Sequence, residues 1–121
     1  MKEKIIGKVG ELLPSLVEDI KAICNMDSRQ DEAAPGHPFG KRVTDCLNKA
    51  LEIAGGMGFE TENVGNQVGI VSWGPDTEDY LACVGHLDVV DVNGVWKTDP
   101  FVCTEKDGTL YARGVLDNKG P

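Results

Sequence analysis

The sequence predicts an α/β protein in which two helices are followed by a mixed sheet. Two stretches with apolar residues at steps of three and four come first, and segments with a strand-like period follow from residue 59. The chain has 121 residues, of which 40% are hydrophobic and 26% charged. This composition fits one small domain that buries only part of its apolar surface, without internal repeats or a second domain.

Each helix is predicted from its own apolar period. Apolar residues recur from Ile5 to Ile23, which indicates an amphipathic helix over residues 2–24, with a kink or restart at Pro14. Residues 26–40, "MDSRQDEAAPGHPFG", lack a period and contain two prolines and two glycines, so a loop is expected. A second helix is predicted from Val43 to Ala54, with the glycine pair at 55–56 as its stop.

The strand predictions follow a change in period. "FETENV" and "QVGIVSW" are typical of strands, and "GTLYARG" indicates a further short one. "YLACVGHLDVV", residues 80–90, begins with an apolar run that does not alternate. Such a run is expected for a strand that is covered on both faces of a layered protein.

The charge balance excludes two classes of partner. Twelve basic residues against twenty acidic ones give a net charge of −8, which argues against nucleic acid or an anionic membrane as partner. No export signal or membrane span is visible in the sequence. The four cysteines show neither close pairing nor zinc-ribbon spacing, so we expect reduced, mostly buried thiols and a cytoplasmic location.

A histidine and an aspartate follow the apolar run of residues 80–84. On a continuing strand, His86 and Asp88 would share one face, where His86 could bind a metal ion while Asp88 holds the other ring N–H. A histidine at a strand end is more often a hydrogen-bonded structural residue. Asp117 follows a glycine-containing turn, where it could bridge two metal ions or cap a helix.

Several segments together resemble one enzyme family. "GHLDVV", "GVW", "DPF" and "LYARGVLDNKGP" are similar, in this order, to the amino-terminal part of the co-catalytic zinc peptidases. That family includes aminoacylases, succinyl-diaminopimelate desuccinylase, carboxypeptidase G-type enzymes and PepV-type dipeptidases. "APGHPFG" and "ALEIAGGMGFETENVGN" resemble the PepV-type branch most. The resemblance implies that residues 1–121 form the N-terminal portion of a three-layer α/β/α catalytic domain.

The resemblance also implies roles for three residues. His86 would ligate one metal ion, Asp117 would bridge two ions, and Asp88 would act in catalysis by holding the imidazole of His86. The implied cofactor is a pair of divalent ions, with zinc expected first and manganese or cobalt as alternatives. The implied reaction is hydrolysis of dipeptides or short peptides by a water activated between the ions, without a covalent intermediate.

The sequence departs from the family pattern at Asp91, Ala112 and Asn118, where proline, glycine and a second aspartate are usual. The glutamate pair that supplies the general base and a further ligand, and the later acidic and histidine ligands, are not among residues 1–121. We therefore expect the isolated chain to bind metal poorly and to be inactive. The alternative is a non-catalytic partner-binding or metal-responsive module on the same scaffold, and no oligomeric state is predicted.

Three further residues keep two interpretations each. Trp96 and Phe101 could line a substrate rim, although such aromatic residues more often pack a loop onto its domain. Arg113 could pair with a carboxylate of a substrate or of the protein itself.

Overall fold

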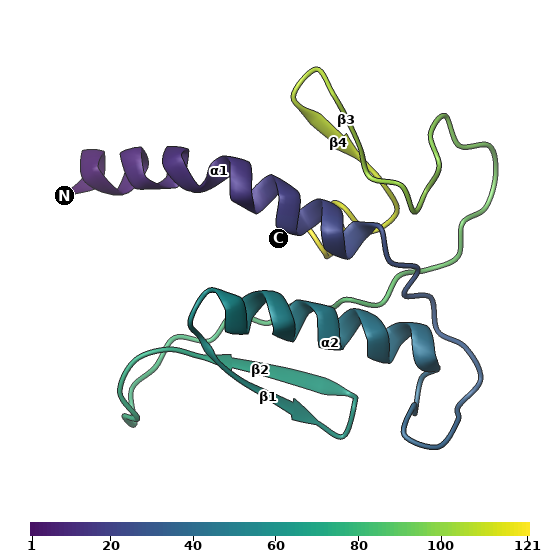
Figure 1. Cartoon of the computed structure of the whole chain (residues 1–121), viewed down its shortest axis with the longest axis horizontal. Helices are drawn as coiled ribbons and strands as arrows, with labels where there is room; N and C mark the ends of the chain where they lie inside the picture. Colours follow the sequence, from purple (N-terminus) through teal and green to yellow (C-terminus); the bar gives the residue numbers. More distant parts are fainter.

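The computed structural model describes residues 1–121. The elements, in chain order, are α1 (Lys2–Cys24), α2 (Lys41–Gly56), β1 (Glu60–Val64), β2 (Val68–Ser72), β3 (Thr104–Lys106) and β4 (Thr109–Tyr111). Both helices precede all strands, which confirms the predicted class. The strands form two separate antiparallel hairpins (Figure 1). The one parallel pairing is an isolated bridge between Arg29 and Val89.

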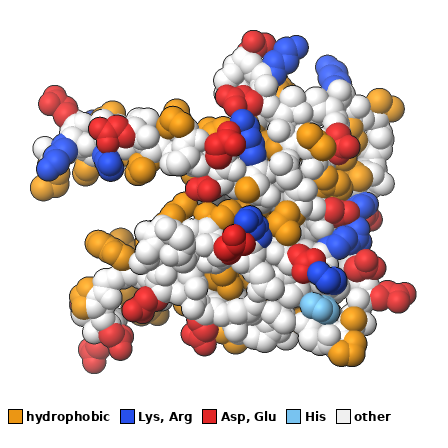
Figure 2. Space-filling model, in the orientation of Figure 1, with side chains coloured by type: hydrophobic (Ala, Val, Ile, Leu, Met, Phe, Trp, Pro, Cys, Tyr) orange, Lys and Arg blue, Asp and Glu red, His pale blue; other side chains and the backbone are white.

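Helix α1 runs without interruption through Pro14, so the predicted restart there is wrong. A proline removes one backbone hydrogen bond, but the helical apolar spacing is the same on both sides of it and the helix continues. The N-terminal half of α1 projects away from the other elements (Figure 1). Its apolar side chains therefore stay exposed, with Ile5 at 57% and Leu12 at 50%, and they are visible as hydrophobic atoms along the projection (Figure 2).

Helix α2 has the predicted position and ends in a glycine-dependent cap. Gly58 has a φ of 93°, a left-handed conformation that glycine adopts without steric cost. Its N–H donates to the carbonyl of Gly55 at 3.0 Å, and the N–H of Phe59 donates to the carbonyl of Ala54 at 3.2 Å. This bond pattern is a Schellman motif. The residue that ends the helix is therefore Gly58, just beyond the predicted glycine pair.

Strands β1 and β2 confirm the first two strand predictions and form a hairpin on α2. The loop between them is the three residues 65–67, in which Gly65 and Asn66 have positive φ values of 61° and 57° and the N–H of Gln67 donates to the carbonyl of Val64 at 3.1 Å. Strand β2 packs closely on the helix because Gly69 has no side chain. A Cβ at that position would lie 2.8 Å from Cδ1 of Leu47 and 3.0 Å from Cδ2 of Leu51.

The predicted strand over residues 80–90 is absent, and its predicted burial is also wrong. Only Val89 makes a bridge, while Leu81 is 101% and Val84 96% exposed. A strand exists through backbone hydrogen bonds to a neighbouring strand. Strand β2 pairs only with β1, and no other strand of the chain lies alongside this segment.

Strands β3 and β4 form the second hairpin around Asp107 and Gly108, whose φ values are 52° and 72°. Strand β4 confirms the short strand predicted within "GTLYARG", whereas β3 was not predicted. Two contacts attach this hairpin to the end of α1. The N–H of Cys103 donates to Oδ1 of Asn25 at 2.7 Å, and Nζ of Lys21 lies 2.8 Å from Oε2 of Glu105.

The small core lies around the C-terminal end of α1 and α2. Its buried hydrophobic residues are Cys24, Cys46, Leu47 and Val89. All four cysteines are free, and burial raises the pKa of Cys24 to about 11, which makes it a poor nucleophile. Cys83, however, is exposed, contrary to the expectation of mostly buried thiols. Neither helix combines the length and hydrophobicity that crossing a membrane would take.

Candidate functional site

The loop that follows α1 fixes the segment that carries His86. Ser28 is fully buried, and its Oγ donates to the carbonyl of Leu87 at 2.6 Å. The carbonyl of Ser28 accepts the N–H of Val89 at 3.3 Å. Because Leu87 and Val89 are held toward this loop, the alternating residues His86 and Asp88 are directed to the open side, as the sequence predicts.

The turn that carries Asp117 packs directly on the His86 segment. Gly114 is buried with a φ of 84°, and a Cβ there would lie 2.7 Å from Cγ1 of Val89. The N–H of Lys119 donates to the carbonyl of Gly114 at 2.8 Å and closes the turn. Oδ1 of Asn118 accepts the N–H of His86 at 3.3 Å. These contacts bring Asp117 beside His86 from a distant part of the sequence.

The three predicted site residues meet around one imidazole ring. Nε2 of His86 lies 2.9 Å from Oδ1 of Asp117. Nδ1 of the same ring lies 3.0 Å from the backbone carbonyl oxygen of Asp88 and 3.3 Å from its carboxylate Oδ1. Asp88 therefore contacts one ring nitrogen and Asp117 contacts the other. Residues 113–118 form turns, and the Asp117 carboxylate contacts His86 rather than capping a helix.

This arrangement favours the protonated imidazole. A backbone carbonyl can only accept a hydrogen bond, so Nδ1 must carry the proton that it donates to Asp88. The Asp117 carboxylate accepts in the same way from Nε2. The hydrogen bond to Asp117, followed by that to the Asp88 backbone, raises the pKa of His86 above its ordinary value. The ring is about half exposed, so the surrounding solvent screens its charge.

The residues fit two positions of a metal site and no more. Zn–N and Zn–O bonds are about 2.0–2.2 Å long, so two ligand atoms of one ion lie roughly 3 Å apart. The Nε2 and Oδ1 atoms of His86 and Asp117 have this separation. Nδ1–H bonded to Asp88 would leave Nε2 free to coordinate, as in many metal-bound histidines. No group of three or more histidine, cysteine, aspartate or glutamate residues in the chain could hold an ion.

The site opens into a hollow of about 250 Å³ lined by His86, Asp88 and the turn that carries Asp117. Arg113 also lines the hollow, but its contacts are with the protein. Its Nη2 donates to the backbone carbonyl of Asp91 at 3.0 Å, and its guanidinium lies 4.8 Å from the centre of the Trp96 ring. In this structure Arg113 pairs with a backbone oxygen rather than a carboxylate, and its guanidinium covers the Trp96 ring.

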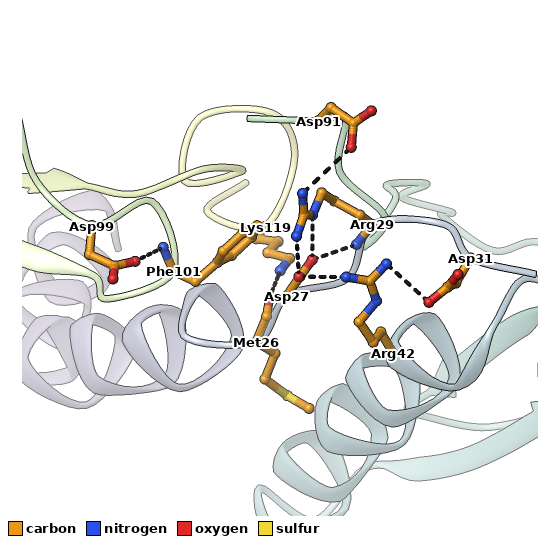
Figure 3. A network of polar contacts seen from close by, with 9 residues as sticks. All are labelled: Met26, Asp27, Arg29, Asp31, Arg42, Asp91, Asp99, Phe101 and Lys119. Carbon is orange, nitrogen blue, oxygen red and sulfur yellow. Dashed lines mark hydrogen bonds and ion pairs between the residues drawn. The ribbon is translucent and has the colours of Figure 1, made fainter. Parts of the chain in front are cut away.

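A charged network centred on Asp27 reaches Asp91, in the segment that follows Asp88 (Figure 3). Asp27 accepts hydrogen bonds from Nε and Nη2 of Arg29 at 2.9 and 2.7 Å and from Nη1 of Arg42 at 2.7 Å. Arg42 also reaches Asp31 at 3.2 Å, and Arg29 reaches Asp91 at 3.6 Å. The Arg29 contact lowers the pKa of Asp27 to about 2. The network links α2, the loop after α1 and the segment that follows Asp88.

Comparisons with known proteins agree with these motifs. The chain is 37% identical over 108 residues to "Putative dipeptidase YtjP" of Bacillus subtilis, a match that covers 88% of this chain and 23% of that protein. It is 36% identical over 110 residues to the "Beta-Ala-Xaa dipeptidase" of Lactobacillus delbrueckii subsp. lactis, again 88% and 23%. The chain resembles dipeptidases. It spans about a quarter of the length of the curated relatives it matches.

The fold also resembles that of a dipeptidase. The crystal structure of human carnosine dipeptidase 1 matches with a TM-score of 0.75 and 27% sequence identity, over 98% of this chain and 28% of that one. The two helices and small antiparallel sheets therefore correspond to part of a peptidase domain. No protein-family model matches the chain.

The sequence analysis did not find the residues that hold the site together. Ser28 and Lys119 carry no local signal for that role, because their partners lie far away in the sequence. Asn118 was noted only as a departure from the family pattern, although its side chain bonds to the backbone of His86.

Proposed function

We propose that residues 1–121 provide part of the active site of a metal-dependent dipeptidase of the PepV-type branch. The observation that carries the proposal is the ring of His86 held between Asp117 and Asp88, with Nε2 2.9 Å from the Asp117 carboxylate. The dipeptidase names of the relatives support the substrate class, dipeptides or short peptides.

Each residue has a distinct role in this proposal. His86 offers Nε2 as a ligand once the ring has lost one proton. Asp88 keeps the proton on Nδ1, which fixes the tautomer and makes Nε2 the better donor atom. Asp117 has two carboxylate oxygens, of which one contacts His86, and we assign it as the bridge between two ions. Asn118 holds the backbone of His86 to the turn that carries Asp117, because its Oδ1 accepts the N–H of His86.

The proposed cofactor is two divalent ions, zinc first and manganese or cobalt next. Bound ions would lower the pKa of a water molecule and polarise the scissile carbonyl. The two ligands of this chain are fewer than the three or four protein ligands of a zinc site, so the remaining ligands and the general base must come from elsewhere. We also propose a cytoplasmic location, which cell fractionation would test.

Hydrolysis of β-Ala-Xaa and α-dipeptides by the complete gene product tests the proposal. We expect zinc- or manganese-dependent hydrolysis that His86→Ala and Asp117→Ala each reduce by at least 100-fold. Asp88→Asn should reduce it by roughly 10–100-fold, the usual effect of losing a residue that orients a ligand. Asp76→Asn, in the exposed segment that follows β2, is the matched control and should leave the rate unchanged.

Hydrolysis that survives removal of His86 or Asp117 would refute the proposed roles. Absence of hydrolysis in the complete gene product would favour the partner-binding or metal-responsive module instead. The 121-residue chain alone should show no hydrolysis with any of the three metals. Reading the coding DNA beyond codon 121 shows whether a Glu-Glu pair and later acidic and histidine ligands follow.

A further inference from the structure

Both halves of the candidate site rest on one short stretch at the C-terminal end of α1. Ser28 binds the backbone of Leu87 and Val89 and so holds the half that contains His86. The half that contains Asp117 reaches the same stretch through a different residue, Lys119.

Lys119 is a buried cation that joins the Asp117 turn to α1. Its side chain is on the inside of the protein, with 5% of the residue exposed. Nζ donates to the backbone carbonyl of Met26 at 2.7 Å and to that of Ile23 at 3.2 Å. Figure 3 shows the side chain running from the turn to Met26, beside the Asp27 network. Carbonyls at a helix C-terminus lack partners within the helix and carry partial negative charge, so they suit an ammonium group.

The same residue shapes the turn itself. Its N–H closes the turn on the carbonyl of Gly114, and its Cδ would lie 3.2 Å from a Cβ at that glycine. Lys119 is therefore held at both its backbone and its Nζ, two residues beyond Asp117. A shift of the turn away from α1 would move Asp117 away from His86.

We infer that Lys119 is a positioning residue of the candidate metal site. By bonding to the carbonyls of Ile23 and Met26, it sets the separation between Asp117 and His86. This inference rests on the proposed function for its meaning, since the geometry that Lys119 holds is the pair of metal ligands. Lys119 does not touch a metal or substrate in this assignment.

The test uses the complete gene product and two NMR readouts. The first needs no metal: nuclear Overhauser contacts between the ring protons of His86 and the β protons of Asp117. The second is the dissociation constant of Zn²⁺ measured from the ring signals of His86, with exposed Cys83 replaced by serine in every variant. Lys119→Met retains the length of the side chain and removes the ammonium group. Lys106→Met, on the exposed end of β3, is the matched control.

We expect Lys119→Met to lose the Overhauser contacts and to weaken Zn²⁺ binding by at least tenfold. Lys119→Arg, which keeps donors for both carbonyls, should restore most of the binding, and Lys106→Met should match the parent chain. The free energy of unfolding, from urea titration, separates this effect from a general loss of structure. If Lys119→Met does not fold, Lys119→Gln takes its place, with an intermediate loss of contacts expected.

Unchanged contacts and unchanged Zn²⁺ binding in a folded variant that lacks the ammonium group would overturn the inference. The parent chain decides the proposed function separately. If Zn²⁺ does not move the His86 signals of the parent chain, the ligand assignment fails. The Overhauser contacts still show whether Lys119 sets the distance between the two residues.

Discussion

The imidazole of His86 is bonded at both nitrogens, and its two acceptors differ in kind. Asp117 accepts through a carboxylate, whereas Asp88 accepts through its backbone carbonyl as well as its side chain. A substitution of Asp88 by asparagine therefore keeps the backbone acceptor. The same substitution of Asp117 removes the charged acceptor of Nε2.

This difference predicts an order of pKa values for His86. Asp117→Asn should lower the pKa of His86 toward its ordinary value, and Asp88→Asn should lower it less, because the largest cause of the raised pKa is the hydrogen bond to Asp117. The sign also means that protons compete with metal ions up to a higher pH than at a free histidine, so metal binding should strengthen as pH rises. A pH titration of the His86 ring signals measures the pKa of His86 in the parent chain, in Asp117→Asn and in Asp88→Asn. A larger shift in Asp88→Asn than in Asp117→Asn would contradict the assigned bonds.

Asp27 gives the clearest prediction for acid stability. Its folded-state pKa of about 2 lies below the ordinary 3.8, so the stabilisation is present above pH 3.8 and is lost as pH falls toward 2. Asp27→Asn should reduce the free energy of unfolding by about 1–2 kcal/mol at pH 7, after allowance for partial exposure, and by little near pH 2. Urea titrations at both pH values measure this. Asp76→Asn is the control, and equal losses in both variants would argue against the ion-pair network.

Among the elements, the end of α2 has two nearby glycines whose replacement by alanine should change the stability of the protein in opposite directions. Gly58 has a φ of 93°, whereas Gly56 is helical, and a Cβ at either would meet nothing within 4 Å. Gly58→Ala should destabilise the protein by about 1 kcal/mol because alanine is strained at positive φ. Gly56→Ala should stabilise it by roughly 0.5–1 kcal/mol because alanine favours the helix. Thermal unfolding followed by circular dichroism compares them, and a stabilising Gly58→Ala would refute the cap.

The elements also show which features the sequence could predict. Helices α1 and α2 and the hairpin of β1 and β2 depend on local periods and turns, so each was predicted close to its observed bounds. The strand over residues 80–90 depends on neighbours that are distant in sequence, and none pairs with it here. Strand β3 has three residues, too few for a period, although the Asp-Gly turn after it was a usable signal.

The residues of the candidate site also divide into those that the sequence could predict and those that it could not. His86, Asp88 and Asp117 could be predicted because the order of motifs resembles a known family, and the structure brings the three together. Ser28 and Lys119 could not, because a buried serine and lysine are defined by backbone acceptors that only the tertiary structure supplies. Their importance follows from burial and bonding, not from residue type.

For the whole molecule, the main fact is how little of it is buried. Nine of 121 residues are buried, and large apolar side chains are exposed on α1 and along residues 80–84. Exposed apolar surface of this extent is typical of a surface that other protein covers. The acidic charge of −8 opposes association but does not remove the apolar surface.

We therefore expect the isolated chain to self-associate through the uncovered segment that contains Leu81 and Val84, which lacks strand partners and is almost fully exposed. Sedimentation velocity over a tenfold or wider concentration range should show a rising mean sedimentation coefficient. Leu81→Lys with Val84→Lys should suppress this rise. Gln67→Lys with Asn93→Lys adds the same two charges at exposed polar positions and should not, because it reduces the net negative charge equally and leaves the apolar segment intact. A monomer at every concentration, or equal suppression by both double variants, would show that this segment does not drive association.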